Sequence, residues 1–188
     1  AEKYTAECFK DFIRRTERMD LLIKRLSRYA NPIVKSLCDE FAGSRYQPVF
    51  FELQIEKGSK DSPAPASFKL DDGRSAYVYG TIDRVDSFVS DGKIYLRVVD
   101  YKTGSKTFSP KDLERGENLQ MFLYLKALSE SEGDGLKEKL GGDSDSRLIP
   151  AGVMYVKADV SDVTVDSIKD SAEELIKANQ ARVGMFLD

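Results

Sequence analysis

Two long runs of β-branched and aromatic residues, 76–89 (AYVYGTIDRVDSFV) and 93–102 (KIYLRVVDYK), are separated only by Ser-Asp-Gly at 90–92. Asp-Gly is a strong hairpin signal, because the tight turn that joins antiparallel strands needs positive φ at its central residues. A hairpin that closes there places residues whose numbers sum to about 183 opposite each other. Asp83 and Asp100 meet this condition, so we expect their carboxylates to converge.

The rest of the chain alternates between helical and strand patterns. Amphipathic helices are predicted over 7–28, from Asn31-Pro32 to 43, from Ser109-Pro110 to 130 and over 165–185; strands are predicted over 48–56 and 148–157. Polar loops are expected at 58–67 and 133–146. The pattern predicts one α/β domain over 1–188, with a helical lead-in (1–43) and a core (44–188) in which helices flank a mixed sheet.

The composition narrows the class of protein. No run approaches the roughly 18 apolar residues of a membrane span, and the charged start AEKYTAECFK is unlike a signal peptide, so a cytoplasmic protein is expected. The chain begins at alanine and ends abruptly, so we expect a fragment of a larger protein. The net charge of -3 is not typical of a domain that holds nucleic acid by general electrostatics.

The chain has no histidine and two cysteines, Cys8 and Cys38, without a CxxC spacing. This excludes Ser-His-Asp and Cys-His catalysis within the chain, a zinc site of the usual spacing and a disulfide framework. Both cysteines are expected to be buried or half-buried thiols. Any hydrolysis must therefore use carboxylates, lysine and a metal ion.

Asp100 and Lys102 lie two apart on the second strand of the hairpin, so their side chains leave the same face. Burying Asp83, Asp100 and Lys102 costs several kcal/mol unless the charges are compensated. A divalent cation is a natural compensation, and Mg²⁺ suits a few hard oxygen ligands. The alternative is that Asp100 and Lys102 form an ion pair on a solvent-facing strand, while Asp83 pairs with Arg84 or another cation.

The motifs GTIDRVD (80–86), VVDYKTG (98–104) and QMFLY (120–124) resemble, in order and spacing, the RecB-like branch of the PD-(D/E)XK nuclease superfamily. With PAGVMY (150–155) included, the sequence looks most like the C-terminal nuclease domain of AddB, which is one of the subunits of bacterial ATP-dependent helicase/deoxyribonucleases. The resemblance implies a restriction-endonuclease-like core that hydrolyses DNA with Mg²⁺ or Mn²⁺. It also implies a helicase partner that supplies single strands during the processing of double-strand breaks.

The resemblance assigns roles only where the motifs match. Asp83, Asp100 and the backbone carbonyl of Tyr101 would ligate the metal, Lys102 would act on the attacking water or the phosphate, and Gln120 would orient water or the DNA backbone. Weaker candidates are Glu52, Tyr124 and Arg84. Each has an ordinary alternative: Gln120 as a packing or solvent-facing amide, Tyr124 in the core, Glu52 facing water, and Arg84 in a structural pair with Asp86.

The chain departs from the family pattern in three ways. Many members of this branch have an upstream metal-binding histidine, which is absent here. Cys8 and Cys38 do not match the four cysteines of an iron-sulfur cluster, so a cluster is expected only in a longer parent protein. No GxxxxGK[ST] loop is present, so no ATP hydrolysis is assigned. Two interpretations stay open beside an active nuclease: a non-cutting module that guides DNA or docks another subunit, and a free-standing RecB-like nuclease such as those linked to CRISPR adaptation.

Overall fold

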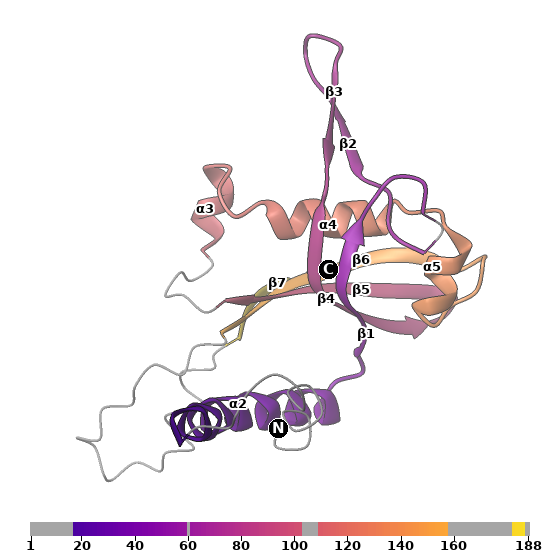
Figure 1. Cartoon of the computed structure of the whole chain (residues 1–188). Helices are drawn as coiled ribbons and strands as arrows, with labels where there is room; N and C mark the ends of the chain where they lie inside the picture. The colour runs from indigo at the N-terminus through magenta and orange to yellow at the C-terminus, as the bar shows by residue number, and fades with distance from the viewer. Residues whose placement is uncertain (1–16, 60, 103–108, 158–181, 187–188) are drawn as a thin grey trace.

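The computed structural model describes residues 17–59, 61–102, 109–157 and 182–186. Its main sheet has the order β1-β4-β5-β6-β7 (Figure 1). The strands are β1 (Gln47–Ile55), β4 (Gly80–Ser90), β5 (Lys93–Lys102), β6 (Arg147–Lys157) and β7 (Arg182–Phe186). The β5–β6 pair is parallel and the other pairs are antiparallel, so the predicted mixed sheet is confirmed.

The β4–β5 hairpin has the register that the sequence predicts. Its paired residues, from Arg84 opposite Val99 to Ser90 opposite Lys93, all sum to 183. Asp91 and Gly92 both have positive φ, 51° and 66°, as the tight turn requires. The turn therefore fixes which side chains share a face near the two motifs.

Helices cover both faces of the sheet (Figure 1). The helix α2 (Glu17–Gly43) lies on one face, where Glu40 contacts Arg84 of β4 and Arg97 of β5. The helix α4 (Gln120–Ser129) packs against β5 and β6 on the other face, over a core that includes Val85, Leu96, Val98, Leu125, Leu128 and Val153. The predicted α/β architecture with flanking helices is confirmed.

Several predicted boundaries are wrong. The helix α2 is continuous through Asn31-Pro32, where a break was expected; hydrogen-bonded turns on both sides outweigh the local cost of about 3 kcal/mol for an interior proline. The helix expected from 109 to 130 divides into α3 (Pro110–Glu114) and α4, because Gly116 and Asn118 have φ of 76° and 56°. A short helix, α5 (Asp134–Lys139), lies inside the predicted loop 133–146.

The C-terminal prediction is also wrong where the structure describes it. A helix was expected to reach Met185, but Arg182–Phe186 forms the edge strand β7, paired antiparallel with β6. Pairing with the open edge of β6 satisfies its backbone hydrogen-bonding groups and outweighs the local helical pattern. The remainder of this predicted helix, and residues 7–16 of the first one, lie outside the described residues.

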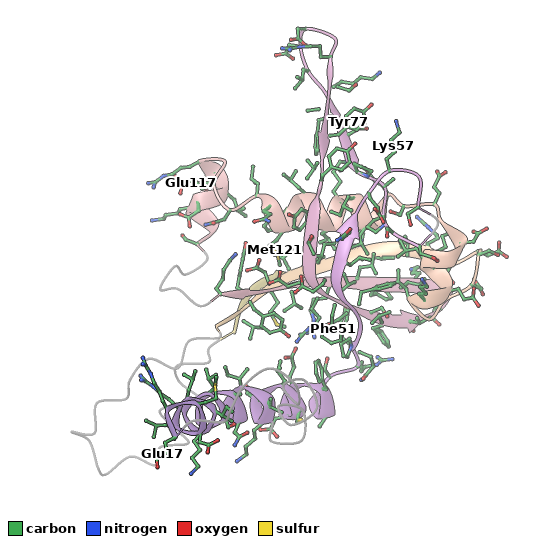
Figure 2. All side chains as sticks on the ribbon, in the orientation of Figure 1. Glu17, Phe51, Lys57, Tyr77, Glu117 and Met121 are labelled. Atoms are coloured by element: carbon green, nitrogen blue, oxygen red, sulfur yellow. The ribbon has the colours of Figure 1, made fainter. Side chains whose placement is uncertain are left out.

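The predicted loop 58–67 is wrong at its end, because its last two residues belong to a second, two-stranded sheet. The strands β2 (Ala66–Lys69) and β3 (Ser75–Val78) pair antiparallel. This hairpin, here called the arm, stands out from the main sheet beyond α4 (Figure 1), and the side chain of Tyr77 lies on it (Figure 2). The predicted strand 76–89 is accordingly two strands, β3 and β4, interrupted at Tyr79.

Within the described ranges, the helices are too short or too polar to cross a membrane.

Candidate active site

Asp83 and Asp100 converge where β4 and β5 lie side by side. Continuing the hairpin register by one pair from Arg84 and Val99 places the two aspartates opposite each other. The Asp83 Oδ2 accepts a hydrogen bond of 2.9 Å from the backbone N–H of Tyr101. This bond fixes one carboxylate against the strand that carries the other, so the two acidic groups are brought together as the sequence predicts.

The ammonium group of Lys102 completes this cluster. Its Nζ lies 2.7 Å from Asp100 Oδ2, while the Lys102 side chain stays 45% exposed and that of Asp100 is only 12% exposed. Burial raises the pKa of Asp100; Lys102 opposes this effect and the nearby Asp83 adds to it. The pair is therefore not a solvent-facing ion pair, because the Asp100 carboxylate is largely buried while the Lys102 side chain is exposed.

Tyr155 of β6 is a neighbour of this cluster that the sequence did not identify. The parallel register of β5 and β6 places it opposite Asp100, and the Lys102 Nζ lies 6.0 Å from the centre of its ring. The pKa of the Tyr155 phenol is raised mainly by burial and, to a smaller extent, by the charge of Asp100. The sequence shows it only as part of PAGVMY, and no turn links β5 to β6 closely enough to predict their register.

Gln120 and Tyr124 are linked to each other and to the first motif. The Gln120 Nε2 donates a hydrogen bond of 2.7 Å to the Tyr124 hydroxyl. A side chain at Gly80 would bring its Cβ to 2.1 Å from that hydroxyl, so the phenol lies directly over the glycine. Gln120 is exposed, whereas Tyr124 is buried in the core. The QMFLY motif (120–124) is thus held against the start of β4, three residues before Asp83.

The two remaining candidates have different surroundings. Glu52 is exposed and lies on β1 between residues paired with Arg84 and Ile82, which puts it opposite Asp83; its φ of 52° is rare for a residue other than glycine. Arg84 points to the opposite face, where it is fully buried and bound to Glu40 and Asp86. The predicted pair of Arg84 and Asp86 is therefore present, and Arg84 is not placed for contact with DNA at the carboxylates.

The donor set fits a divalent cation. Asp100 Oδ2 is buried and makes no hydrogen bond of good geometry, although Lys102 lies beside it. Within the described part of the chain, no group of three Asp, Glu, His or Cys side chains is arranged to hold a metal ion. Two carboxylates and a backbone carbonyl would leave coordination positions to water and phosphate, as is usual for Mg²⁺.

The cysteine prediction is wrong for Cys38, which is exposed on α2 rather than buried or half-buried; Cys8 lies outside the described residues.

Comparison with known families agrees with this geometry. The model of the PD-(D/E)XK nuclease superfamily matches residues 1–183. The chain belongs to this superfamily. Asp83, Asp100 and Lys102 lie together on one face of the sheet, in the β4–β5 hairpin. The central mixed sheet flanked by helices is the restriction-endonuclease-like fold expected for a PD-(D/E)XK member.

Several similar curated proteins are AddB chains, named as a subunit of an ATP-dependent helicase/deoxyribonuclease. The chain is 32% identical to the one from Clostridium acetobutylicum over 142 residues, or 76% of this chain and 11% of that protein. It is 32% identical to the one from Caldanaerobacter subterraneus over 172 residues, or 91% of this chain and 14% of that protein. The chain thus spans about one eighth of the length of these relatives.

Proposed function

We propose that this domain is a divalent-metal-dependent deoxyribonuclease that hydrolyses phosphodiester bonds. The observation that carries the proposal is the buried Asp100 carboxylate, 2.7 Å from an amine that reaches solvent and beside a second carboxylate, Asp83. A buried carboxylate with a raised pKa beside another is typical of a functional site. Membership of a nuclease superfamily and the names of the relatives support the choice of DNA as substrate.

Each side chain has a role that follows from its position. Asp83 and Asp100, with the Tyr101 carbonyl, would hold the cation, which when bound neutralises phosphate charge and acidifies water. Lys102 places its amine at the solvent side of Asp100, where it stabilises negative charge that develops on the scissile phosphate. Gln120 donates one amide hydrogen to Tyr124, and its other amide hydrogen and its carbonyl can orient water or the DNA backbone.

We also propose how the domain receives its substrate. The chain covers only about one eighth of the relatives' length, and they are named as helicase/deoxyribonuclease subunits; this supports a single nuclease domain within a larger helicase-nuclease that processes broken DNA ends. In this arrangement a helicase partner supplies single strands. The net charge of -3 agrees with it, because a domain to which DNA is delivered needs little electrostatic affinity of its own.

Cleavage of an end-labelled single-stranded oligonucleotide tests the proposal, with Mg²⁺, with Mn²⁺ and with chelator. The unmodified chain should cut only with metal. Asp100→Ala and Lys102→Ala should each reduce the rate by about 10²-fold or more, because each removes charge that acts in the transition state. Circular dichroism should show that both variants remain folded.

Lys139→Ala is the matched control. Lys139 is also a half-exposed lysine in an ion pair, 48% exposed and 3.1 Å from Asp61, but it lies on α5 and pairs with neither Asp83 nor Asp100. Its loss should leave cleavage unchanged. Full activity in Asp100→Ala or Lys102→Ala would contradict the site assignment. A folded wild-type chain that cuts with neither metal would instead favour a non-cutting module.

A further inference from the structure

The arm has two chemically different faces. Its register pairs Ala66 with Val78 and Phe68 with Ala76, and of these residues Phe68 and Val78 pack against the core. The other pairs, Ser67 with Tyr77 and Lys69 with Ser75, therefore lie on the opposite face. We call this the outer face, and all four of its residues are exposed.

The outer face continues along the chain to the candidate active site. From β3 into β4, Tyr77, Tyr79 and Thr81 are exposed and alternate with the half-buried Val78 and Gly80 and the buried Ile82. The next residue of this alternation is Asp83, which is half-buried. Tyr77 and Tyr79 are 53% and 56% exposed, and six residues of extended chain from Tyr77 to Asp83 span at most about 20 Å.

The chemistry of this series suits an unpaired nucleic-acid strand. Exposed tyrosine rings can stack on bases of any sequence, while a lysine and hydroxyl groups contact the backbone. Tyr79 lies between β3 and β4 and follows Tyr77 by two residues, a distance of at most about 6.6 Å along an extended chain. The outer face contains Lys69 and no Asp or Glu; the nearest acidic pair, Asp71 and Asp72, lies in the arm's turn, where Asp72 binds Arg74 at 2.6 Å.

We infer that the outer face of the arm binds single-stranded DNA, with Tyr77 and Tyr79 stacking on unpaired bases and directing the strand along Thr81 toward Asp83. The path of the strand toward Asp83 rests on the proposed nuclease function, whereas the binding of unpaired bases by the two tyrosines does not. Duplex DNA should bind much more weakly here, because its bases are stacked on one another and closed to the tyrosine rings.

The test measures binding of a fluorescein-labelled oligo(dT) to the whole chain by anisotropy, in chelator so that no cleavage occurs. Changing both tyrosines, Tyr77→Ala with Tyr79→Ala, should weaken binding by about 25-fold, or about fivefold for each lost stacking contact. Tyr77→Phe with Tyr79→Phe should keep most of the affinity, because the ring remains. Leu70→Ala is the control, since Leu70 is an exposed apolar residue of the same arm, 43% exposed, that cannot stack on a base.

A salt series separates stacking from charge. The double alanine variant should bind more weakly with an unchanged slope of log affinity against log salt, because tyrosine releases no counterions. Lys69→Ala should reduce the slope by about 0.7, the value for one phosphate contact on a single strand. Thermal melts should show that the variants remain folded. Cross-linking of the unmodified chain to an oligonucleotide containing 5-iododeoxyuridine should in addition label Tyr77 or Tyr79.

Binding and cleavage can fail independently. If the double alanine variant binds as tightly as the wild type, or the cross-links map elsewhere, the arm does not bind the strand even though Lys102→Ala still stops cleavage. If the wild type binds through the tyrosines but never cuts, the arm inference stands and the nuclease proposal fails. Equal affinity for a duplex of the same length would also overturn the inference, because it would show that unpaired bases are not needed.

Discussion

Asp100 is the residue at which opposing electrostatic effects meet. Burial raises the pKa of its carboxyl, Lys102 opposes the rise, and Asp83 reinforces it. Because this pKa is higher in the folded chain than its ordinary value, the folded state binds the proton more tightly than the unfolded state. Without metal, the contribution of Asp100 to stability is therefore most favourable below the ordinary value of 3.8, and it decreases as the pH rises through the raised pKa.

A bound cation should reverse this preference, because it favours the charged carboxylate. At pH 7 without metal, Asp100→Asn should therefore be at least as stable as the wild type. Mg²⁺ at ten times its Kd should stabilise the wild type by about 1.4 kcal/mol and leave Asp100→Asn unchanged. Thermal melts with and without Mg²⁺, at pH 7 and near pH 4, measure both effects. An equal response of the variant to Mg²⁺ would move the cation away from Asp100.

At the level of single residues, the sequence predicts what the chain brings together locally. The turn at Asp91-Gly92 defines the register of β4 and β5, so the convergence of Asp83 and Asp100 follows from arithmetic on the sequence. The position of Tyr155 beside Asp100 cannot be predicted from the sequence in this way. It reaches Asp100 through a parallel pair whose strands are separated by 44 residues, 103 to 146, and whose register depends on packing over α4.

At the level of elements, Gly80 lets β4 pack closely against α4. It is the first residue of the GTIDRVD motif and lies against Tyr124 of α4, the helix that also carries Gln120. The Tyr124 hydroxyl occupies the place where a side chain at position 80 would stand, and Gln120 donates a hydrogen bond to that hydroxyl. The glycine is therefore needed for the close approach of α4 to β4. Its φ is not positive, so backbone strain plays no part in the requirement.

Gly80→Ala should destabilise the chain by about 1–3 kcal/mol, the usual cost of overpacking, and should reduce cleavage because it displaces Gln120. Gly43→Ala is the control, since a Cβ there meets nothing within 4 Å. Adding Tyr124→Phe to Gly80→Ala should recover part of the lost stability, because the atom at 2.1 Å is removed. Urea denaturation of the single and double variants measures the coupling; simple additivity would show that the two residues do not meet.

The elements that sequence reasoning missed share a physical cause. The arm begins inside GSKDSPAPAS (58–67), whose prolines and polar residues indicate a loop, yet residues 66–69 gain partners from β3 and from the core. The strand β7 likewise exists because the edge of β6 offers hydrogen-bonding groups. The helix α5 has only six residues, among glycine, serine and aspartate, and it is held by the buried Leu136. In each case contacts that are distant in sequence outweigh the local pattern.

At the level of the whole molecule, a buried ionic network ties α2 to the sheet. The Glu40 Oε1 lies 3.1 Å from Arg84 and 2.9 Å from Arg97. Asp86 binds the same two arginines, at 2.8 Å and 2.6 Å. The four charges sum to zero, and none of their side chains is more than 7% exposed. Such a network contributes to stability only while every charge keeps its partner.

Removing one member should therefore be costly. Glu40→Ala leaves two buried arginines with one carboxylate, so it should destabilise the chain by about 3 kcal/mol or more. For a chain of this length that corresponds to a fall in Tm of roughly 6–12 °C. Asp39→Ala is the matched control, because Asp39 precedes Glu40 on α2 but is exposed, and its loss should shift Tm by less than about 2 °C.

The same variant tests how the helical lead-in relates to the candidate active site. Glu40 contacts the face of the sheet opposite Asp83, so its loss should lower stability without changing the cleavage rate per folded molecule at a temperature well below the Tm. Arg84 would remain paired with Asp86 and with the Tyr101 hydroxyl, 2.7 Å away. A large loss of activity in folded Glu40→Ala would show that α2 reaches the carboxylates through Tyr101, whose backbone N–H binds Asp83.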